Sequence, residues 1–170
     1  PPPPLFFFNP YTAYALTVGL VGSEMCNIPK PFETFDELSS LYDQHVHDQG
    51  ERRFIVMEGS ARVGLVELVE IDLIHRRAEI QIFIDPNFQG RGLASRAMRL
   101  ALDYGFKVLN LHKVYLYVDK VNTKAVHIYS KLGFITEGEL VDEFFANGEY
   151  RTALRMYMLQ PQYLRLGNAT

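Results

Sequence analysis

The chain has 170 residues, of which 48% are hydrophobic and 22% charged, with a formal net charge of −3 at pH 7. A chain of this size and composition forms one domain that buries about 70% of the surface it exposes when unfolded. The negative charge argues against nucleic acid and anionic membranes as partners, and the single cysteine, Cys26, excludes an internal disulfide and favours a reducing cytoplasm.

Residues 1–31 form an unusual N-terminal segment, which begins with four prolines and carries no charge before Glu24. Its apolar stretch, residues 5–22, is 18 residues long, close to the lower limit for spanning a bilayer. Asn9 and Pro10 interrupt this stretch, and no lysine or arginine flanks it or supplies the basic start of a signal peptide. We therefore expect neither a membrane helix nor a signal, and we assign the folded domain to residues 32–170.

A helix and two strands are expected at the start of this domain. Thr34 and Glu37 have the spacing of a capping box, and apolar residues then recur at helical spacing to about His47. Two apolar stretches, residues 52–58 and 61–72, flank a Gly-Ser pair and predict two strands joined by a turn.

The next stretch predicts a strand that leads through a turn into a helix. In RAEIQIFIDP, residues 77–86, the side chains of Glu79, Gln81 and Phe83 alternate with three isoleucines, which places the two sets on opposite faces of a strand. Beyond the turn, small and apolar residues recur at helical spacing in one stripe that consists of Ala94, Ala97, Met98, Ala101 and Leu102. A helix with such small residues can pack closely against the strand.

The turn between them, Gln89-Gly90-Arg91-Gly92, has features of an anion site. A Walker loop requires Gly-Lys-Ser/Thr, and a Rossmann loop requires a third glycine where this chain has Ser95, so neither applies. At the start of a helix, unpaired backbone N–H groups and the helix dipole both favour an anion. Glycine lets a phosphate approach the backbone because it has no Cβ, although an isolated Gly-x-Gly is more often an ordinary turn.

A second strand and helix and a final hairpin complete the pattern. Residues 112–119 predict the strand and residues 122–134 the helix, and two further strands, residues 139–145 and 150–159, flank an Asn-Gly turn. Strands that alternate with helices and end in a hairpin indicate a mixed α/β sheet with a central parallel pair.

Two motifs carry a family resemblance. Residues 89–94, QGRGLA, are similar to the (Q/R)-x-x-G-x-(G/A) pyrophosphate loop of the GCN5-related N-acetyltransferases (GNAT), and residues 122–134, NTKAVHIYSKLGF, are similar to the following Asn-x-x-Ala-x-x-x-Tyr-x-x-x-Gly-Phe segment. Stretches between residues 32 and 164, among them GLVELVEI, HRRAEIQIFI and VLNLHKVYLYVDKVN, resemble the bacterial spermidine/spermine N-acetyltransferases of that superfamily. The resemblance implies the GNAT fold, a mixed, mostly antiparallel sheet with a central splayed parallel strand pair flanked by helices. It also implies acetyl transfer from acetyl-coenzyme A (acetyl-CoA) to a polyamine, spermidine or spermine, by a homo-oligomer that is a dodecamer in the resembling enzymes.

The resemblance assigns the cofactor to a strand, a turn and a helix. The strand would hold the pantetheine arm through the backbone of Ile82, Phe83 and Ile84, and the turn would hold the pyrophosphate through Gln89, Gly90, Arg91, Gly92, Leu93 and Ala94. On the second helix, the cofactor residues would be Asn122, Ala125 and Lys131. Asn122 and Tyr129 lie seven residues apart, about two helical turns, so both can face the cofactor from one side.

Two residues are expected to carry the chemistry. Acetyl transfer from a thioester to an amine requires an uncharged nitrogen, a donor for the oxyanion and a proton for the departing thiolate. Tyr129 is the candidate general acid because a phenol with a pKa near ~10 stays protonated at pH 7; outside the motif it would count as one of several packing tyrosines. By resemblance, Glu79 and Gln81 lie near the acceptor amine, and Glu79 could receive the ammonium proton directly or through water.

An acidic segment is the candidate site for the polyamine. Residues 31–51 contain no lysine or arginine, and although such a run is usually a solvated helix face, it would attract an extended polycation. By resemblance, an allosteric polyamine site between subunits comprises Glu37, His45, His47, Asp48 and Glu51, and Glu70 corresponds to a ligand of a divalent metal, Mg or Ca. Glu33, in the same acidic run, is a further candidate for substrate or effector binding. The family's paired carboxylates before the proline of this helix are replaced here by Cys26-Asn27-Ile28-Pro29-Lys30. His45 and His47 are two residues apart, so they do not share a helix face and make a poor metal pair.

Two other functions are compatible with the same motifs. Another transferase of this fold could act on a protein N-terminal amine or an aminoglycoside. A non-catalytic acyl-CoA or polyamine sensor would keep the glycine turn but would not require Tyr129.

Overall fold

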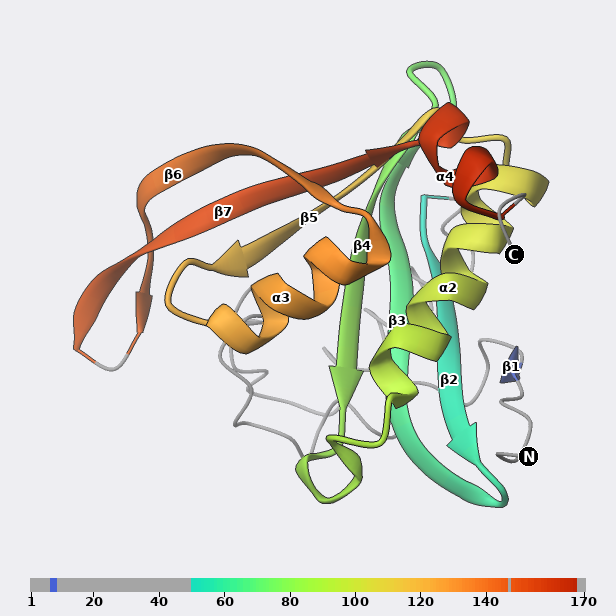
Figure 1. The fold of residues 1–170 in the computed structure, drawn as a ribbon, viewed down its shortest axis with the longest axis horizontal. Coiled ribbons are helices and arrows are strands. Elements are labelled where there is room, and N and C mark those ends of the chain that lie inside the picture. Colours follow the sequence, from blue (N-terminus) through green and yellow to red (C-terminus); the bar gives the residue numbers. More distant parts are fainter. Residues whose placement is uncertain (1–6, 9–49, 147, 168–170) are drawn as a thin grey trace, which may run out of the picture.

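The computed structural model describes residues 7–8, 50–146 and 148–167. In this part of the chain, seven strands form one sheet in the order β1-β2-β3-β4-β5-β7-β6, and helices α2 and α3 lie on the same face of it (Figure 1). The strands are β1 Phe7–Phe8, β2 Arg52–Glu58, β3 Ala61–Asp72, β4 Arg77–Ile84, β5 Lys113–Asp119, β6 Ile135–Ala146 and β7 Glu149–Leu159. The helices are the 3-10 helix η2 Pro86–Phe88, α2 Leu93–Asp103, the π-helix η3 Tyr104–Val108, α3 Thr123–Leu132 and α4 Gln160–Gly167. The helix expected between Thr34 and His47 lies outside the described residues.

The first three long strands are antiparallel, as the sequence predicts for β2 and β3. Gly59 turns between these two strands with a φ of 62°, a left-handed conformation that glycine adopts without strain. Across β3 and β4, Glu67 pairs with Gln81 and Val69 with Glu79. Because paired residues share a face, these polar side chains lie together, while Ile80 is buried on the other side. The predicted alternation along β4 is therefore confirmed.

β4 and β5 are the only parallel neighbours in the described sheet, and they pair over three residues. Arg77, Ala78 and Glu79 face Lys113, Val114 and Tyr115 in register. Beyond Glu79, β4 continues for five residues to Ile84 alongside β3 but not alongside β5, and the two strands point in different directions in Figure 1. The central parallel pair and its splay are both as predicted.

Helix α2 closes the core over this sheet. Its predicted inner stripe is buried at Ala97, Met98, Ala101 and Leu102, whereas Ala94 is half-buried. Small side chains at these positions let the helix approach the sheet, where its apolar face packs into the main core cluster. The helix then continues directly into the five-residue π-helix η3, which the sequence pattern did not indicate.

The C-terminal hairpin is confirmed, with a longer first strand than expected. β6 begins at Ile135 and pairs with β7 up to Ala146 and Glu149. The sequence pattern predicted a start at residue 139, just beyond the register shift that the structure shows between Thr136 and Gly138. After β7 the chain forms α4, which was not predicted. Within the described part of the chain, no helix is both long and apolar enough to cross a membrane.

Candidate active site

The glycine turn at the start of α2 has the local structure of an anion site. Gly90 and Gly92 have φ angles of 78° and 74°, and a Cβ on either would meet no atom within 4 Å among the described residues. Gly92 is the N-cap residue of α2; no side chain caps the helix there, and its first turn contains no acidic residue. The helix N-terminus therefore offers backbone N–H groups and the positive end of its dipole to the surrounding space.

Neighbouring side chains hold this turn in place. The Nε2 of Gln89 donates a hydrogen bond of 3.1 Å to the backbone oxygen of Ile84, which ties the turn to the end of β4. Arg91 forms an ion pair of 3.1 Å with Glu58 and lies over the ring of Phe88, 4.9 Å from its centroid. Arg91 is therefore directed toward the β2–β3 turn, whereas the expected phosphate contacts at Gly90 and Gly92 depend on backbone N–H groups.

Helix α3, which follows β5, carries Asn122 and Tyr129. Asn122 is the N-cap, and its Oδ1 accepts a hydrogen bond of 3.0 Å from the backbone N–H of Ala125. This cap stabilises the helix start, typically by about 1 kcal/mol, and leaves the amide nitrogen of Asn122 for other contacts. The predicted cofactor residues Ala125 and Lys131 are half-buried and exposed, respectively.

Tyr129 is half-buried against the core. Its ring meets Phe134 edge to face, with centroids 6.2 Å apart. No described residue forms a hydrogen bond with its hydroxyl, and burial alone raises the pKa of the Tyr129 phenol to about 12. The hydroxyl therefore stays protonated throughout the neutral range and keeps its proton available for donation.

Glu79 lies at the point where β4 and β5 separate. The Nε2 of Gln81 donates a hydrogen bond of 2.8 Å to its carboxylate. Burial raises the pKa of Glu79, the Gln81 hydrogen bond opposes this rise, and the negative charge of Glu70 adds to it. A carboxylate with a raised pKa is a stronger base than an exposed one, so Glu79 is suited to accept a proton.

Glu70 reaches the same region from a bulge in β3. Its φ of 50° accompanies a shift in the register between β3 and β4. The hydroxyl of Tyr115 on β5 donates a hydrogen bond of 2.6 Å to the Glu70 carboxylate. Burial first, and then this carboxylate, raise the pKa of Tyr115 well above its ordinary value. The structure thus brings Glu70, Glu79 and Gln81 together around Tyr115, which the sequence reasoning did not single out.

Arg155 is a second residue of this face that the sequence reasoning missed. Its guanidinium lies 4.4 Å from the ring centroid of Tyr115 and 5.6 Å from that of Tyr117. It also forms an ion pair of 3.3 Å with Glu137. The alternation of Tyr115 and Tyr117 along β5 could have indicated a shared face, but the approach of β7 to that face is a tertiary feature.

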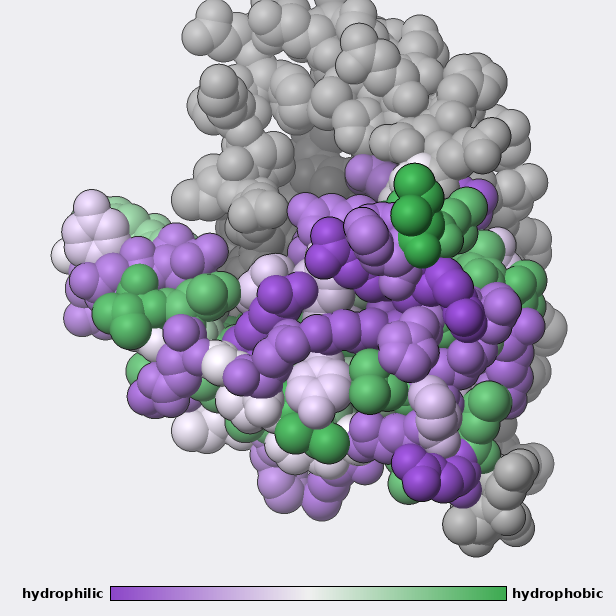
Figure 2. Space-filling model, turned by 90° about the horizontal axis from the view of Figure 1, so that it is seen from above, coloured by the Kyte–Doolittle hydropathy of each residue, from purple (hydrophilic) through white to green (hydrophobic). Residues whose placement is uncertain are grey.

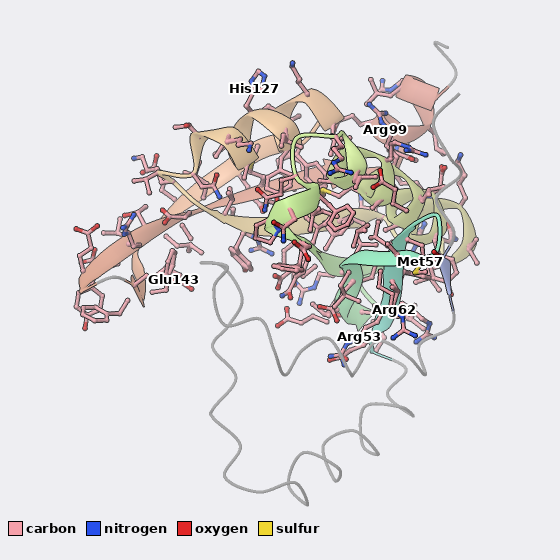
Figure 3. All side chains as sticks on the ribbon, turned by 90° about the horizontal axis from the view of Figure 1, so that it is seen from below. Arg53, Met57, Arg62, Arg99, His127 and Glu143 are labelled. Carbon is pink, nitrogen blue, oxygen red and sulfur yellow. The ribbon has the colours of Figure 1, made fainter. Side chains whose placement is uncertain are left out.

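Two more glutamates, Glu67 on β3 and Glu51 just before β2, lie beside Arg53. We call Glu51, Glu67, Glu70 and Glu79 the acidic row. Arg53 forms ion pairs with Glu67 at 2.6 Å and with Glu51 at 2.7 Å, and burial raises the pKa of Glu67. Arg53 is labelled beside the β2–β3 end of the sheet in Figure 3. Glu51, an expected effector residue, is therefore engaged in an ion pair within this row.

The remaining predicted effector residues are not described by the structure. Glu33, Glu37, His45, His47 and Asp48 all lie outside the described residues. Among the residues that are described, no group of three or more His, Cys, Asp or Glu side chains could hold a metal ion. Glu70 on its own does not form a metal site, so further ligands would have to come from elsewhere.

Comparison with known proteins places this arrangement in a family. Residues 22–134 match the model described as "Acetyltransferase (GNAT) family". The chain belongs to the GNAT family of acetyltransferases. Within this family it groups with the bacterial spermidine N-acetyltransferases: it is 64% identical to the spermidine N(1)-acetyltransferase of Escherichia coli (strain K12) over 135 residues, which cover 79% of this chain and 73% of the relative.

Solved structures of spermidine N-acetyltransferase from Vibrio cholerae share the GNAT fold of this chain. The structure in complex with CoA and spermine is 54% identical, with a TM-score of 0.75 over 80% of this chain and 81% of that chain. A dodecameric structure in an intermediate state is also 54% identical, with a TM-score of 0.76 over 81% of both chains. A complex with manganese ions is 46% identical, with a TM-score of 0.83 over 96% of this chain and 95% of that chain.

Proposed function

We propose that the protein transfers the acetyl group of acetyl-CoA to a primary amine of spermidine or spermine. The observation that carries the proposal is the combination of a parallel strand pair that separates after three residues with a left-handed glycine turn at an uncapped helix start. The separated strand offers free backbone groups to the extended pantetheine arm of CoA, and the glycine turn offers N–H groups to its pyrophosphate. The choice of substrate is supported by the spermidine N-acetyltransferase relatives and by the acidic and aromatic face around Glu79.

Cofactor binding would depend mainly on backbone groups. Along Ile82–Ile84, β4 has backbone groups that no described strand pairs on the β5 side, and they can hydrogen-bond the pantetheine amides. The turn Gln89–Ala94 would bind the pyrophosphate through its N–H groups, with Gly90 and Gly92 leaving space for the phosphate oxygens. Asn122, Ala125 and Lys131 would contact the cofactor from α3.

The protein's own residues would move two protons during transfer. As the amine nitrogen forms its bond to the acetyl carbon and the carbon–sulfur bond breaks, Glu79 accepts the proton lost by nitrogen, directly or through water. Tyr129 donates its phenolic proton to the departing sulfur. The raised pKa of Glu79 makes this carboxylate the better base, and Tyr129 remains protonated at neutral pH, as a proton donor must.

Polyamine selection would depend on carboxylates at two places. Glu79, Gln81 and Glu70 lie near the point of strand separation, where the reacting amine would enter. The acidic segment from Glu33 to Glu51 would hold the other ammonium groups or form the effector site, with a Mg or Ca ion at Glu70 if ligands outside the described residues complete it. We further propose a cytoplasmic homo-oligomer, in line with the dodecameric relative, whose catalytic domain spans residues 32–170.

A thiol-release assay with acetyl-CoA tests this function directly. The acceptors would be spermidine, spermine, an aminoglycoside and a peptide with a free N-terminus. Rapid release with both polyamines and slow release with the other two is the expected pattern. Fast release with the peptide or aminoglycoside alone would assign a different acceptor to the same fold. Acetyl-CoA binding without release for any acceptor would indicate a sensor.

A further inference from the structure

Three side chains connect the segments that meet where β4 and β5 begin. Arg76 directly precedes β4, Asn110 lies between η3 and β5, and Gln160 begins α4. The Nε of Arg76 donates to the backbone oxygen of Asn110 at 2.7 Å, and its NH2 group donates to the Asn110 Oδ1 at 2.8 Å and the Gln160 Oε1 at 3.1 Å. We call Arg76, Asn110 and Gln160 the vertex clamp, because they lie at the closed end of the splayed pair.

The clamp is a closed network of side chains and backbone. The Nε2 of Gln160 donates to the Asn110 Oδ1 at 2.9 Å and to the backbone oxygen of Phe106 in η3 at 2.8 Å. The backbone oxygen of Arg76 accepts from the N–H groups of His112 and Lys113, and the N–H of Gln160 donates to the oxygen of His112. Each clamp residue thus contacts the other two, and together they join β4, η3, β5 and α4.

Two clamp residues have unusual backbone conformations. Arg76 and Asn110 both have a φ of 54°, in the left-handed region that asparagine tolerates and arginine adopts rarely. Such conformations persist where the surrounding structure over-determines them, and they are concentrated at sites with a positional role. Here the two strained residues are bonded to each other, which points to a demand on geometry at this end of the sheet.

Because the parallel pairing is short, a small rotation at the paired residues produces a large displacement at the far end of β4. Only Arg77–Glu79 pairs with β5, and Ile84 lies five residues further along β4. At about 3.3 Å per residue this is roughly 16 Å, so a rotation of about 4° at the vertex moves Ile84 by about 1 Å. A misplacement of about 1 Å between reacting groups can lower a rate about 100-fold.

We propose that the vertex clamp sets the angle between β4 and β5, and thereby positions the Gln89–Ala94 turn relative to Tyr129. Arg76, Asn110 and Gln160 are positioning residues, which act through the two strands without touching the substrates. Control of the angle between β4 and β5 does not depend on what the protein does, whereas its consequence for acetyl transfer rests on the proposed function.

The clamp is accessible to substitution without disturbing the core. Asn110 is exposed, and Arg76 and Gln160 are half-buried. In the coloured part of Figure 2, which shows the molecule from this end, hydrophilic residues cover more of the surface than hydrophobic ones. A change at Asn110 therefore leaves no apolar cavity, and its effect on the strand angle is separable from a loss of packing.

A matched pair of substitutions at Asn110 provides the test. Asn110→Asp keeps an oxygen that accepts from both Arg76 and Gln160 and tolerates a positive φ. Asn110→Gly tolerates this φ even better but removes the side-chain oxygen that accepts from Arg76 and Gln160, while the backbone oxygen of residue 110 remains. If the residue served only the local turn, glycine would be harmless; if it serves the clamp, glycine weakens the network and aspartate preserves it. Arg99→Ala, at an exposed position of α2 (Figure 3), is the control.

The strand angle can be measured directly by electron-resonance distances between two spin labels. Arg62→Cys near the start of β3 and His127→Cys on α3 are labelled in a Cys26→Ser background; both positions are exposed and lie on opposite sides of the molecule in Figure 3. We expect Asn110→Gly and Arg76→Ala to broaden the distance distribution or shift it by roughly 1–3 Å, as the rotation estimate implies. Asn110→Asp and Arg99→Ala should keep the parent distribution.

The consequence for activity is measured on the same variants without labels, well below their melting temperatures. We expect Asn110→Gly to lower kcat at least about tenfold, within the range that misplacement allows, with a smaller change in the KM for the amine. Unchanged distances in Asn110→Gly and Arg76→Ala would overturn the proposal whatever the activity. If the distances change as expected but the parent protein releases no thiol from acetyl-CoA, the clamp stands and the proposed function fails.

Discussion

The change Tyr129→Phe removes one oxygen from the candidate site and leaves the ring in place. The ring packs against Phe134 and the core, and phenylalanine keeps both contacts. No described residue would lose a hydrogen bond. Because a buried hydroxyl without a partner costs about 1–3 kcal/mol, we expect the free energy of unfolding to stay the same or rise.

The size of the catalytic effect follows from the pKa of Tyr129. Burial raises this pKa to about 12, whereas an alkyl thiol has a pKa near ~8.5. Protonation of a free thiolate by Tyr129 would be uphill by about 5 kcal/mol. The phenol must therefore share its proton with the sulfur while the carbon–sulfur bond breaks. The buried environment helps, because it also raises the pKa of the thiol. We therefore expect the lower end of the usual range for general acids, a fall in kcat of about 100-fold, or about 2.7 kcal/mol.

The assay is steady-state thiol release with saturating spermidine, combined with calorimetric measurement of acetyl-CoA affinity. The matched control is Tyr104→Phe, since Tyr104 is also half-buried and meets the ring of Phe54 edge to face, 5.3 Å between centroids. The parent kcat should show no ionisation of Tyr129 between pH 6 and 10, because its phenol stays protonated below its raised pKa. Turnover of Tyr129→Phe within threefold of the parent would refute its role as the acid.

Three further substitutions test other parts of the site. Gly92→Asp should weaken acetyl-CoA binding at least tenfold, about 1.4 kcal/mol. The loss should be greater than in Gly92→Asn, which imposes similar backbone strain without the charge. Equal calorimetric affinities of the two variants for acetyl-CoA would contradict the assignment of the turn as an anion site. Glu79→Gln should lower kcat/KM and remove the part of its rise with pH that comes from ionisation of Glu79, leaving the part that comes from deprotonation of the amine. It should also raise the melting temperature at pH 7 but not below pH 4.5, because burial raises the pKa of Glu79. The contribution of Glu79 to stability is therefore present below 4.5 and is lost as the pH rises through the folded-state pKa. A melting temperature equal to that of the parent at both pH values would contradict this assignment. Replacing Glu37 and Glu51 by Gln should raise the spermidine concentration needed for half-maximal rate and reduce its salt dependence, because salt screens the attraction between carboxylates and ammonium groups. The acetyl-CoA dependence should stay nearly intact; an unchanged spermidine dependence would exclude these carboxylates from recognition.

Local patterns in the sequence predicted the elements that position the site. The alternation along β4, the glycine turn and the stripe of α2 each depend on residues within a few positions of one another, and all three have the predicted structure. The left-handed angles at Gly90 and Gly92 follow from the same local logic, because glycine is the residue that adopts them readily.

Contacts between distant segments were not predictable in the same way. Arg76 and Gln160 are 84 residues apart in sequence, and Arg155 reaches Tyr115 only because β7 pairs with β5. Such features arise from tertiary pairing, which periodicity does not encode.

Competition between amines tests the central claim most directly. The parent protein is incubated with acetyl-CoA and equal concentrations of spermidine and propylamine at low salt, and the acetylated products are measured by mass spectrometry. Spermidine offers about two more ammonium groups to carboxylates, each contact being worth roughly 1.5–3 kcal/mol when partly desolvated, so acetylspermidine should exceed acetylpropylamine by at least about 100-fold. Equal amounts of the two products, or no acetylated amine above the level without protein, would contradict the account.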